Sequence, residues 1–489
     1  MQKTLVVLVY TRTGWDIKNV TALLPLSVLY LARPLSRAGF QPVIIDQRIQ
    51  PDWAARLAEL APQALLVGIS AMTGTQIAWG LKAAAVARQA APATRIVWGG
   101  IHPSLLPEQT ARHPLVDFVV RGEGEITLPE LAAALAANEA PRHVAGLTWF
   151  DGETLVQTPD RPRLADLSEA LIPDYGALRV EDYLTTQTLG LRDLAITTSR
   201  GCPNGCRYCY NLPYNGRRWR AQPAEQVVEH IAQIVRRFGV QGILIKDDNF
   251  YADRRRVEAI AAGLKSRNLA VTIRGECRAD YIARHWDEPF LDYLRNNGFR
   301  EMTVGAESGD DKTLARLGKD ITVADIREAN RRLGRAGIPT KFTFMTGFPE
   351  ESEAARRRTI DLMLELTDAN PTARLTPLHL YTPYPGTPLF AEAVAAGYRP
   401  PADLAEWAAV SFHNLDLPWI DRRLSRKLEK LSVATYFLDR QTVAEYFTGR
   451  PLIQWAARLY SRIIRWRARR MFLSCMPETA LINFYRQRH

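Results

Sequence analysis

The sequence is poor in cysteine and contains no long apolar run. Five cysteines among 489 residues are too few for a disulfide framework, which indicates a reducing compartment such as the cytoplasm. No window of 18 apolar residues free of charges occurs, which argues against a membrane-spanning helix. The first apolar run, "TLVVLVY", is short and lacks the small-residue cleavage site of a signal peptide. We therefore expect a cytoplasmic protein.

The chain also lacks a general excess of basic residues. The net charge is +11, but residues 451–489 contain eight Arg and one Glu and so supply +7 of it. The remainder is close to balanced, which gives no indication of a nucleic-acid-binding surface, and we expect no nucleic-acid partner. Hydrophobic residues make up 47% and charged residues 24%, an ordinary globular balance over a length that suits two or three domains.

Residues 1–140 alternate between strand-like and helix-like segments. The strand-like runs are "TLVVLVY", "QPVIID", "ALLVGIS", "RIVWGG" and "VDFVVRGEGE". This alternation predicts a Rossmann-like α/β domain with a parallel, doubly wound sheet, whose ligand lies at the carboxyl ends of the strands. The dinucleotide fingerprint GxGxxG is missing after the first run, where "VYTRTGWD" stands instead, which argues against NAD or FAD.

The rest of the chain divides into three further segments. Residues 141–190 indicate a linker with a small hairpin, since "DG" stands between two short runs. Residues 191–395 contain six strand candidates separated by helices, which predicts a partial parallel (β/α)6 barrel. Residues 396–489 are mostly helical in pattern.

Three of the five cysteines lie within one loop, "GCPNGCRYCY", at residues 201–210. Structural zinc usually takes four ligands from two separated pairs, whereas Cys277 and Cys475 are distant single residues. Three thiolates on a four-iron cluster would leave one iron open to a chelating substrate. A structural zinc site or unpaired buried thiols are the alternatives.

The loop resembles the signature of the radical S-adenosylmethionine (SAM) enzymes. The resemblance implies a [4Fe-4S] cluster held by Cys202, Cys206 and Cys209, and SAM on the open iron, cleaved to a 5′-deoxyadenosyl radical. It also implies an anaerobic reaction fed by a reductase or by a flavodoxin or ferredoxin. Further residues are implied to contact SAM: Tyr208 and the segment around Gly347 and Pro349 at the adenine, Asp247, Asp248 and Asn249 at the amino group, Glu276 and Arg278 at ribose or carboxylate, and Glu307 and Ser308 at ribose or methionine. The usual "GGE" is replaced here by "KDDNF".

Residues 1–390 as a whole resemble the cobalamin-dependent radical SAM enzymes, in which a Rossmann-like domain precedes the barrel. The implied corrin contacts lie on three strand-end loops: Ser70, Thr73 and Gln76; Gly99, Gly100 and His102; Glu123 and Gly124. The DxHxxG motif of the cobalamin mutases is absent, because "DQRIQPD" occupies residues 46–52. The resemblance therefore implies base-off cobalamin, and His102 is either a corrin contact or an ordinary loop histidine.

The implied reaction is transfer of a methyl group from methylcobalamin to an unactivated carbon or phosphorus of a small molecule. We favour methylation because most of the family methylates. A radical cyclase or ring-rearranging enzyme, for example tetrapyrrole cyclase-like and without net methyl transfer, is the alternative. A non-enzymatic iron–sulfur or corrinoid carrier is disfavoured, because a carrier has no use for an open iron.

The segment "PLIQWAARLYSRIIRWRARRMF" (451–472) has the period of an amphipathic helix. Arg458, Arg462, Arg465 and Arg469 are predicted on one face, and Trp455, Leu459, Ile463 and Trp466 on another. Such a helix suits an anionic membrane surface, which favours a hydrophobic or lipid-like substrate and a peripheral position on the inner face of the membrane. The alternatives are a helix packed on the barrel with a solvated basic face, or a phosphate-binding role for "WRARR".

Overall fold

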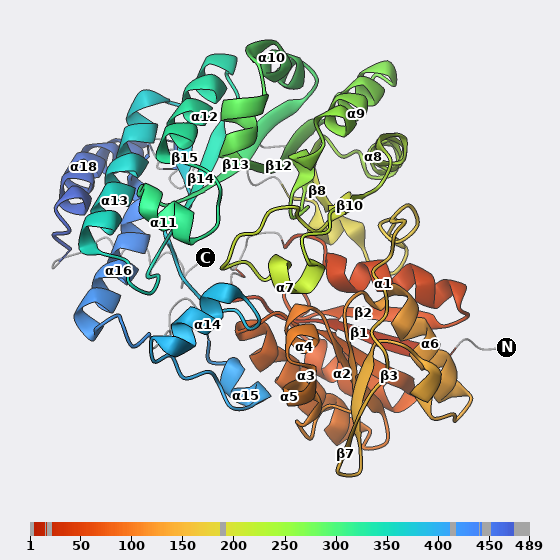
Figure 1. Cartoon of the computed structure of the whole chain (residues 1–489). Coiled ribbons are helices and arrows are strands. Elements are labelled where there is room, and N and C mark those ends of the chain that lie inside the picture. Colours follow the sequence, from red (N-terminus) through yellow and green to blue (C-terminus); the bar gives the residue numbers. More distant parts are fainter. Residues whose placement is uncertain are drawn as a thin grey trace.

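The computed structural model describes residues 4–14, 16, 22–185, 192–410, 417–439, 441–442 and 451–473. It contains two α/β units, one formed by the first third of the chain and one by the middle, with the C-terminal helices running along both (Figure 1). The predicted α/β class, with a Rossmann-like sheet, a partial barrel and a helical C-terminal region, is confirmed.

The first sheet has the strand order β2-β1-β3-β4-β5-β6-β7. The first five strands are parallel, and β6 and β7 form an antiparallel hairpin at the edge. The strands are β1 (Leu5–Tyr10), β2 (Gln41–Asp46), β3 (Ala64–Ser70), β4 (Arg95–Gly99), β5 (Phe118–Val120), β6 (Leu147–Asp151) and β7 (Thr154–Gln157). The hairpin that we expected in the linker is thus an extension of this sheet beyond residue 140.

Helices cover both faces of the first sheet, as its nearly continuous apolar strands require. α1 (Leu26–Arg37) and α6 (Gly124–Ala136) pack together on one face, and α2 (Trp53–Leu60) and α3 (Thr75–Ala90) on the other. The short helices α4 (Ile101–Leu105) and α5 (Pro107–Ala111) follow β4. The two faces contribute to separate buried apolar clusters. Because the helices take the faces, the carboxyl ends of the strands are left for loops that can bind a ligand.

The second sheet is the partial barrel, with the parallel order β8-β11-β12-β13-β14-β15. The strands are β8 (Asp193–Ile196), β11 (Gly242–Ile245), β12 (Thr272–Arg278), β13 (Phe299–Glu307), β14 (Thr340–Thr346) and β15 (Ala373–Leu375), and β16 (His379–Leu380) also pairs with β14. The helices are α8 (Ala224–Phe238), α9 (Arg254–Ser266), α10 (Glu288–Asn296), α11 (Asp311–Arg316), α12 (Val323–Ala336) and α13 (Glu353–Ala369). All six predicted strands are therefore present.

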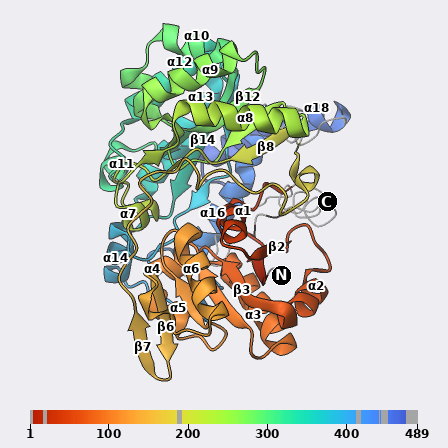
Figure 2. The ribbon, with the colours of Figure 1, turned by 90° about the vertical axis from the view of Figure 1, so that its right-hand side faces the viewer.

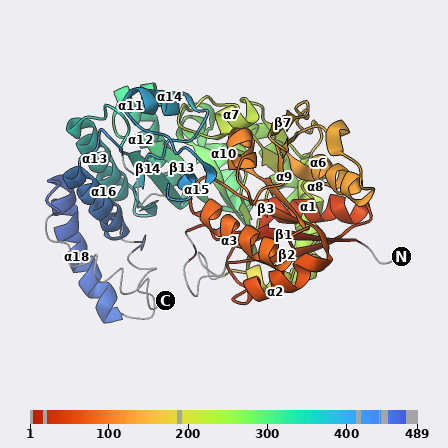
Figure 3. The same cartoon turned by 90° about the horizontal axis from the view of Figure 1, so that it is seen from below.

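The cysteine loop lies at the junction of the two units, beside α7 (Asn211–Asn215) (Figure 2). It is braced by a short ribbon of β9 (Ser199–Arg200) and β10 (Arg220–Ala221). The C-terminal helix α14 (Pro388–Ala395) packs mainly on the second unit. The following helix α15 (Leu404–Trp407) packs on the first unit, where the indole of Trp407 donates to Gln109 Oε1 over 2.6 Å. α16 (Arg422–Ala434) and α18 (Pro451–Arg469) lie along the rim of the second unit (Figure 3). None of the described helices is both long and apolar enough to span a membrane.

Candidate active site

The cysteine loop turns sharply at its start, and this turn requires a glycine. Gly201 has φ +86°, and a Cβ there would lie 1.9 Å from the carbonyl oxygen of Arg218. Its backbone N–H donates to Asp248 Oδ2 over 2.9 Å, which ties the loop to the end of β11. The free thiols of Cys202, Cys206 and Cys209, which follow the turn, are all partly exposed. The fourth described cysteine, Cys277, is buried, and Cys475 lies outside the described residues.

Hydrogen-bond donors surround these thiols. Cys202 Sγ lies 3.3 Å from Asn204 Nδ2 and 3.5 Å from Asn249 Nδ2, and Cys206 Sγ lies 3.9 Å from the guanidinium of Arg278. Burial raises the pKa of Cys209 to about 12, which favours the protonated thiol when no metal is bound. No group of three or more His, Cys, Asp or Glu in the described part of the chain could hold a metal ion by itself. A cluster, by contrast, gives each thiolate its own iron, and its sulfurs accept such hydrogen bonds, so the loop fits a cluster.

The three residues expected at the SAM amino group have different surroundings. Asp247 is buried and accepts hydrogen bonds from the backbone and hydroxyl of Thr198 (2.6 and 2.7 Å) and from Ser199 Oγ (2.6 Å), so it braces the strand that leads into the loop. Asp248 is exposed and also accepts from Tyr210 OH over 3.1 Å. Asn249 donates to Tyr281 OH over 3.0 Å, and its buried Oδ1 has no partner. Polar atoms of Asp248 and Asn249 therefore lie beside the cysteine loop, whereas those of Asp247 are turned away from it.

Glu276 and Arg278 both lie on β12, near the loop. The Glu276 side chain is half exposed, 3.9 Å from Lys246 Nζ. Arg278 is fixed by Asp280, at 2.9 Å, and by the carbonyl of Lys319, in an orientation that carries its guanidinium toward Cys206. This arrangement puts a fixed positive charge beside the sulfur of Cys206.

Glu307 ends β13 in a left-handed conformation, with φ +63°, which is rare for a residue other than glycine and concentrates at functional sites. Its buried carboxylate pairs with Lys319 Nζ at 2.8 Å, and Lys319 in turn lies 3.5 Å from Tyr208 OH. Lys319 was not predicted, because it follows a helix rather than a strand. Ser308 is fully buried against Thr359 Oγ1 at 3.2 Å, and so it supports the loop from behind.

The segment after β14 closes over the same region. Gly347 (φ +85°) donates to Glu351 Oε2 over 2.7 Å and accepts from the indole of Trp419 over 3.0 Å. The carbonyl of Pro349 accepts from Arg316. Phe348, which lies between Gly347 and Pro349 in the sequence, packs in one apolar cluster with Tyr208. The structure therefore brings together the loop tyrosine and the segment that were both expected at the adenine.

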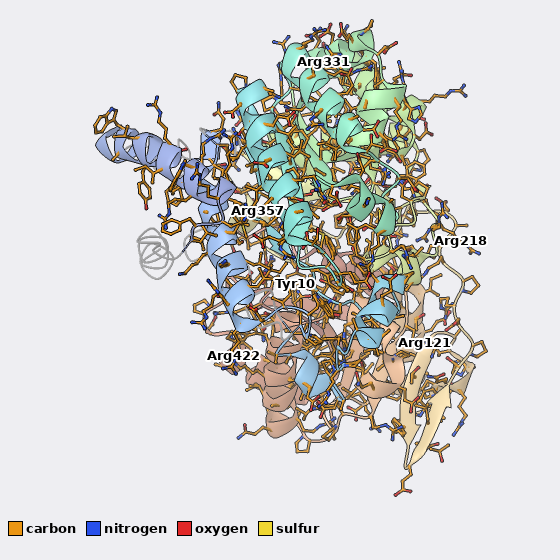
Figure 4. All side chains as sticks on the ribbon, turned by 60° about the vertical axis from the view of Figure 1, so that its left-hand side comes forward. Tyr10, Arg121, Arg218, Arg331, Arg357 and Arg422 are labelled. Carbon is orange, nitrogen blue, oxygen red and sulfur yellow. The ribbon has the colours of Figure 1, made fainter. Side chains whose placement is uncertain are left out.

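A cavity of about 310 Å³ lies between the two units, at the carboxyl edge of the first sheet. Its first wall comes from α1 and from the loops after the strands of the first sheet, including Tyr10, which lies at the junction of the units in Figure 4. Its second wall is formed by Thr197, Arg200, Tyr210, Tyr214, Asn215 and Asp248 of the cysteine-loop region. Of the predicted corrin contacts, Ser70, Gln76, Gly99, Gly100, Glu123 and Gly124 line it.

Small residues and close backbone contacts shape the first wall. Gly100 has φ +98°, and a Cβ there would lie 2.8 Å from the carbonyl oxygen of Ala71. Ser70 Oγ donates to Ser27 Oγ over 3.0 Å, and Gln76 Oε1 accepts from the backbone of Met72 over 2.8 Å. The result is a wall of glycines and fixed polar groups beside apolar lining residues, which fits a broad, amide-rimmed ligand such as a corrin.

Thr73 and His102 bond to each other and are not among the residues that line the cavity. Thr73 Oγ1 lies 3.0 Å from His102 Nδ1, and the fully buried ring packs edge-on against Trp407, with centroids 5.3 Å apart. Burial lowers the pKa of His102 to about 3, which keeps the ring neutral. Asp46, where the mutase motif would begin, is buried in a 2.7 Å pair with Arg48. No histidine is found among the described residues that line the cavity.

A buried charge cluster joins the two units at the cavity. Glu123 pairs with Arg200 at 3.2 Å and with Arg220 at 2.9 Å, and Arg200 also binds Glu125. Burial alone would raise the pKa of Glu123, but the two guanidinium groups, Arg220 foremost, hold it below its usual value. Sequence reasoning missed Arg200 and Tyr210, although Arg200 directly precedes the cysteine loop and Tyr210 ends it, and that position was the available signal.

The comparisons with known proteins agree with this geometry. The sequence matches the radical SAM superfamily over residues 196–363 and the B12 binding domain over residues 19–132. The chain is a cobalamin-dependent radical SAM enzyme. Its cofactors are accordingly a [4Fe-4S] cluster, SAM and cobalamin.

Individual relatives of this radical SAM enzyme differ in their named reactions. An uncharacterized methyltransferase of Pyrococcus horikoshii is 27% identical over 428 residues, which are 86% of this chain and 90% of that one. An anaerobic magnesium-protoporphyrin IX monomethyl ester cyclase of Cereibacter sphaeroides is 29% identical over 377 residues, which cover 75% of this chain and 60% of the cyclase. The solved structure of the radical SAM methyltransferase TsrM from Kitasatospora setae, with cobalamin and a [4Fe-4S] cluster bound, has a TM-score of 0.69 at 18% identity and covers 94% of this chain and all of TsrM, which shows a shared fold.

Proposed function

We propose that this enzyme methylates an unactivated carbon, or phosphorus, of a small hydrophobic or lipid-like molecule. The observation that carries the proposal is the single cavity shared by the two units: its first wall belongs to the B12-binding domain and its second wall to the cysteine-loop region. When bound, the cluster and SAM supply a radical that abstracts hydrogen, and methylcobalamin supplies the methyl group. A substrate held between the two walls would meet both reagents.

The residues of the chain would contribute position and exclusion of water. Cys202, Cys206 and Cys209 would hold the cluster, and Asn249 and Arg278 would donate to its sulfur ligands. Asp248 and Tyr210, which bond to each other at 3.1 Å on the second wall, are the polar groups best placed to orient a substrate. The floor of the cavity is apolar, with Leu8, Leu31, Ile69 and Val97 among its lining residues, which supports a hydrophobic substrate.

We further propose that cobalamin is bound base-off and without a histidine ligand. The proposal is supported by His102, which packs against Trp407 and does not line the cavity, and by Asp46, which forms an ion pair with Arg48. A reductase, or a flavodoxin or ferredoxin, would deliver the electron to the cluster.

A radical cyclase or rearranging enzyme is the second candidate function, favoured by the identity to the magnesium-protoporphyrin cyclase over 75% of this chain. The same cavity would then hold the substrate ring without net methyl transfer. The two functions differ in their nucleoside products. Methylation would consume a second SAM as the source of the methyl group and would therefore release S-adenosylhomocysteine in addition to 5′-deoxyadenosine.

The test is an anaerobic reaction of the reconstituted enzyme with cobalamin, reductant, SAM that carries a CD3 group, and a lipid extract of the host. A methylase releases 5′-deoxyadenosine together with S-adenosylhomocysteine and leaves a CD3 group in one extract component, as read by mass spectrometry. Release of 5′-deoxyadenosine alone, rising with added extract, would overturn methylation in favour of the second function. The Cys206→Ala variant should give neither product.

A further inference from the structure

Helix α18 exposes its apolar face instead of burying it. Trp455, Leu459, Ile463 and Trp466 are 67%, 52%, 51% and 51% exposed, and Phe472, just beyond the helix, is 54% exposed. These are five of the seven large hydrophobic side chains reported as exposed in the described part of the chain. They form one stripe, because positions 455, 459, 463 and 466 recur at the helical period. We call these five residues the α18 stripe.

The opposite side of α18 explains this orientation. Ala457, Ile464 and Ala468 are buried against the body of the protein, and Ser461 Oγ donates to the carbonyl of Phe437 over 2.7 Å. Arg465 also turns inward, where it binds Asp368 at 2.5 Å and Thr367 Oγ1 at 2.9 Å on α13. The predicted basic face is therefore divided: part of it anchors the helix, and the apolar face is left outward. The side chain of Arg458 lies outside the described residues.

The charge around the stripe is positive. α18 contains five Arg and no acidic residue, which gives +5, and the neighbouring α16 contains five Arg or Lys and one Glu, which gives +4. Arg462, Arg469 and Arg470 are exposed beside the stripe, and the guanidinium of Arg470 lies 5.1 Å from the ring centroid of Trp466. Figure 3 shows α16 and α18 side by side at the rim of the molecule, and Figure 4 shows α18 projecting from it, with Arg422 labelled on α16.

We propose that the α18 stripe docks the enzyme on a bilayer surface that contains anionic lipids. Exposed Trp, Leu, Ile and Phe match the depth of the headgroup boundary, where Trp is enriched, and flanking arginines match anionic headgroups. The helix lies in the plane of the surface in this arrangement, and its anchor to α13 keeps the enzyme attached. The basic flanks favour this occupant over a second copy of the chain, because two copies would oppose like charges across the contact.

The test uses the full-length protein and sedimentation with vesicles of phosphatidylcholine alone or with about a third of phosphatidylglycerol. We expect binding to the anionic vesicles and, for Trp455→Ser/Trp466→Ser, a loss of binding on the order of tenfold or more, since each Trp contributes interfacial affinity. Arg462→Gln/Arg470→Gln should weaken binding to anionic vesicles by about thirtyfold, at about 1 kcal/mol for each of the two charges. The matched controls are Val394→Ser, another exposed apolar residue, and Arg237→Gln/Arg255→Gln, two exposed arginines elsewhere; both should bind like the wild type.

Three results would overturn the proposal. The first is no sedimentation of the wild type with anionic vesicles, and the second is equal sedimentation of the wild type and Trp455→Ser/Trp466→Ser. The third is a concentration-dependent dimer, seen by light scattering, that this double variant abolishes while no vesicle binding occurs, because the stripe would then be a contact between copies. Circular dichroism of each variant checks that α18 and the fold persist. None of these readouts depends on methyl transfer, so the docking proposal and the proposed function can fail separately.

Discussion

The two walls of the central cavity are built differently. The second-unit wall and the cysteine loop beside it are rich in charged and hydrogen-bonding side chains, such as Arg278 beside Cys206 and Asp248 on Gly201. The B12-domain wall has glycines and close backbone contacts, such as Gly100 against Ala71, above an apolar floor. The first wall is suited to stabilise a charged metal–sulfur group, and the second wall is suited to a broad ligand. Substitutions in the cysteine-loop region should therefore affect the cluster, and substitutions in the B12-domain wall should affect cobalamin binding.

The largest effect is expected at the cysteine loop. Cys206→Ala removes one of the three proposed cluster ligands, so the brown iron–sulfur absorbance and all cleavage of SAM should be lost. Cys277→Ala, which changes a buried cysteine outside the loop, is the matched control and should keep both. Cobalamin binding, followed by its visible spectrum, should persist in both variants if the two walls act separately, and its loss in Cys206→Ala would break the comparison.

The next effect is expected at Gly100 on the opposite wall. Gly100→Ala adds a Cβ only 2.8 Å from the Ala71 carbonyl oxygen and strains a positive φ, at a cost of about 1–3 kcal/mol. We expect cobalamin affinity to fall by about tenfold or more, as measured by equilibrium dialysis, with the cluster absorbance unchanged. Gly39→Ala carries a similar strain, at φ +91° with nothing within 4 Å, and should retain cobalamin. Equal losses of cobalamin affinity in the two variants would mean that backbone strain alone, and not the shape of the cavity wall at Gly100, sets the affinity.

A smaller effect is expected where the walls are joined. Glu123→Gln leaves Arg200 and Arg220 without the carboxylate that they share, which should lower the free energy of unfolding by about 2 kcal/mol. The pKa of Glu123 is depressed in the folded protein, so its contribution is present above its ordinary pKa and is lost as the pH falls through the folded value. Chemical denaturation at pH 7 and pH 4 should show a difference between wild type and variant that shrinks at the lower pH. A difference that is constant with pH would contradict the charge cluster.

At neutral pH the smallest effect is expected at His102, which influences stability only in acid. Its folded pKa of about 3 lies below the ordinary value near 6.5, so the unfolded chain binds an additional proton between these values. Stability should be unaffected above about pH 6.5 and fall with decreasing pH, by up to about 1.4 kcal/mol per pH unit from this group. Protonation of His102 would also disturb the loop after β4, which lines the cavity, so cobalamin affinity should fall with decreasing pH as well. His102→Gln should flatten both the stability slope and the affinity slope. The control His230→Gln, which removes a buried ring of pKa about 4 in the second unit, should change the stability slope alone.

The sequence was more informative for the cysteine loop than for the corrin wall. Cysteine spacing is a local pattern, and consecutive parallel strands bring their end motifs to one rim of the sheet. Asn249, Arg278 and Glu307 could therefore be expected near the cysteine loop, and the structure has them there. The orientation of the individual side chains was harder to predict. Asp247 turns away to Thr198 and Ser199, and Ser308 turns to Thr359, because a strand-end motif does not determine which member faces the ligand.

On the B12-domain wall, all three of the expected loops line the cavity, but Thr73 and His102 do not. His102 faces backward because Trp407, some 300 residues later in the chain, offers it an aromatic partner, and no local pattern reports such a partner. The same reason applies to α18. Its two faces follow from the helical period, but which face turns inward depends on Asp368 of α13 and on the apolar surface around it. Distant partners of this kind account for most of what the sequence did not predict.

The most direct measurement is pulsed electron paramagnetic resonance on the anaerobic enzyme that contains both cob(II)alamin and the reduced cluster. If the two walls serve one cavity, the two spins are close, and the cob(II)alamin signal should relax faster, with a resolved dipolar interaction, when the cluster is reduced. The Cys206→Ala variant, which lacks the cluster, should restore slow relaxation. A cob(II)alamin signal that is indifferent to the state of the cluster in the wild type would place the two cofactors apart and contradict the shared site.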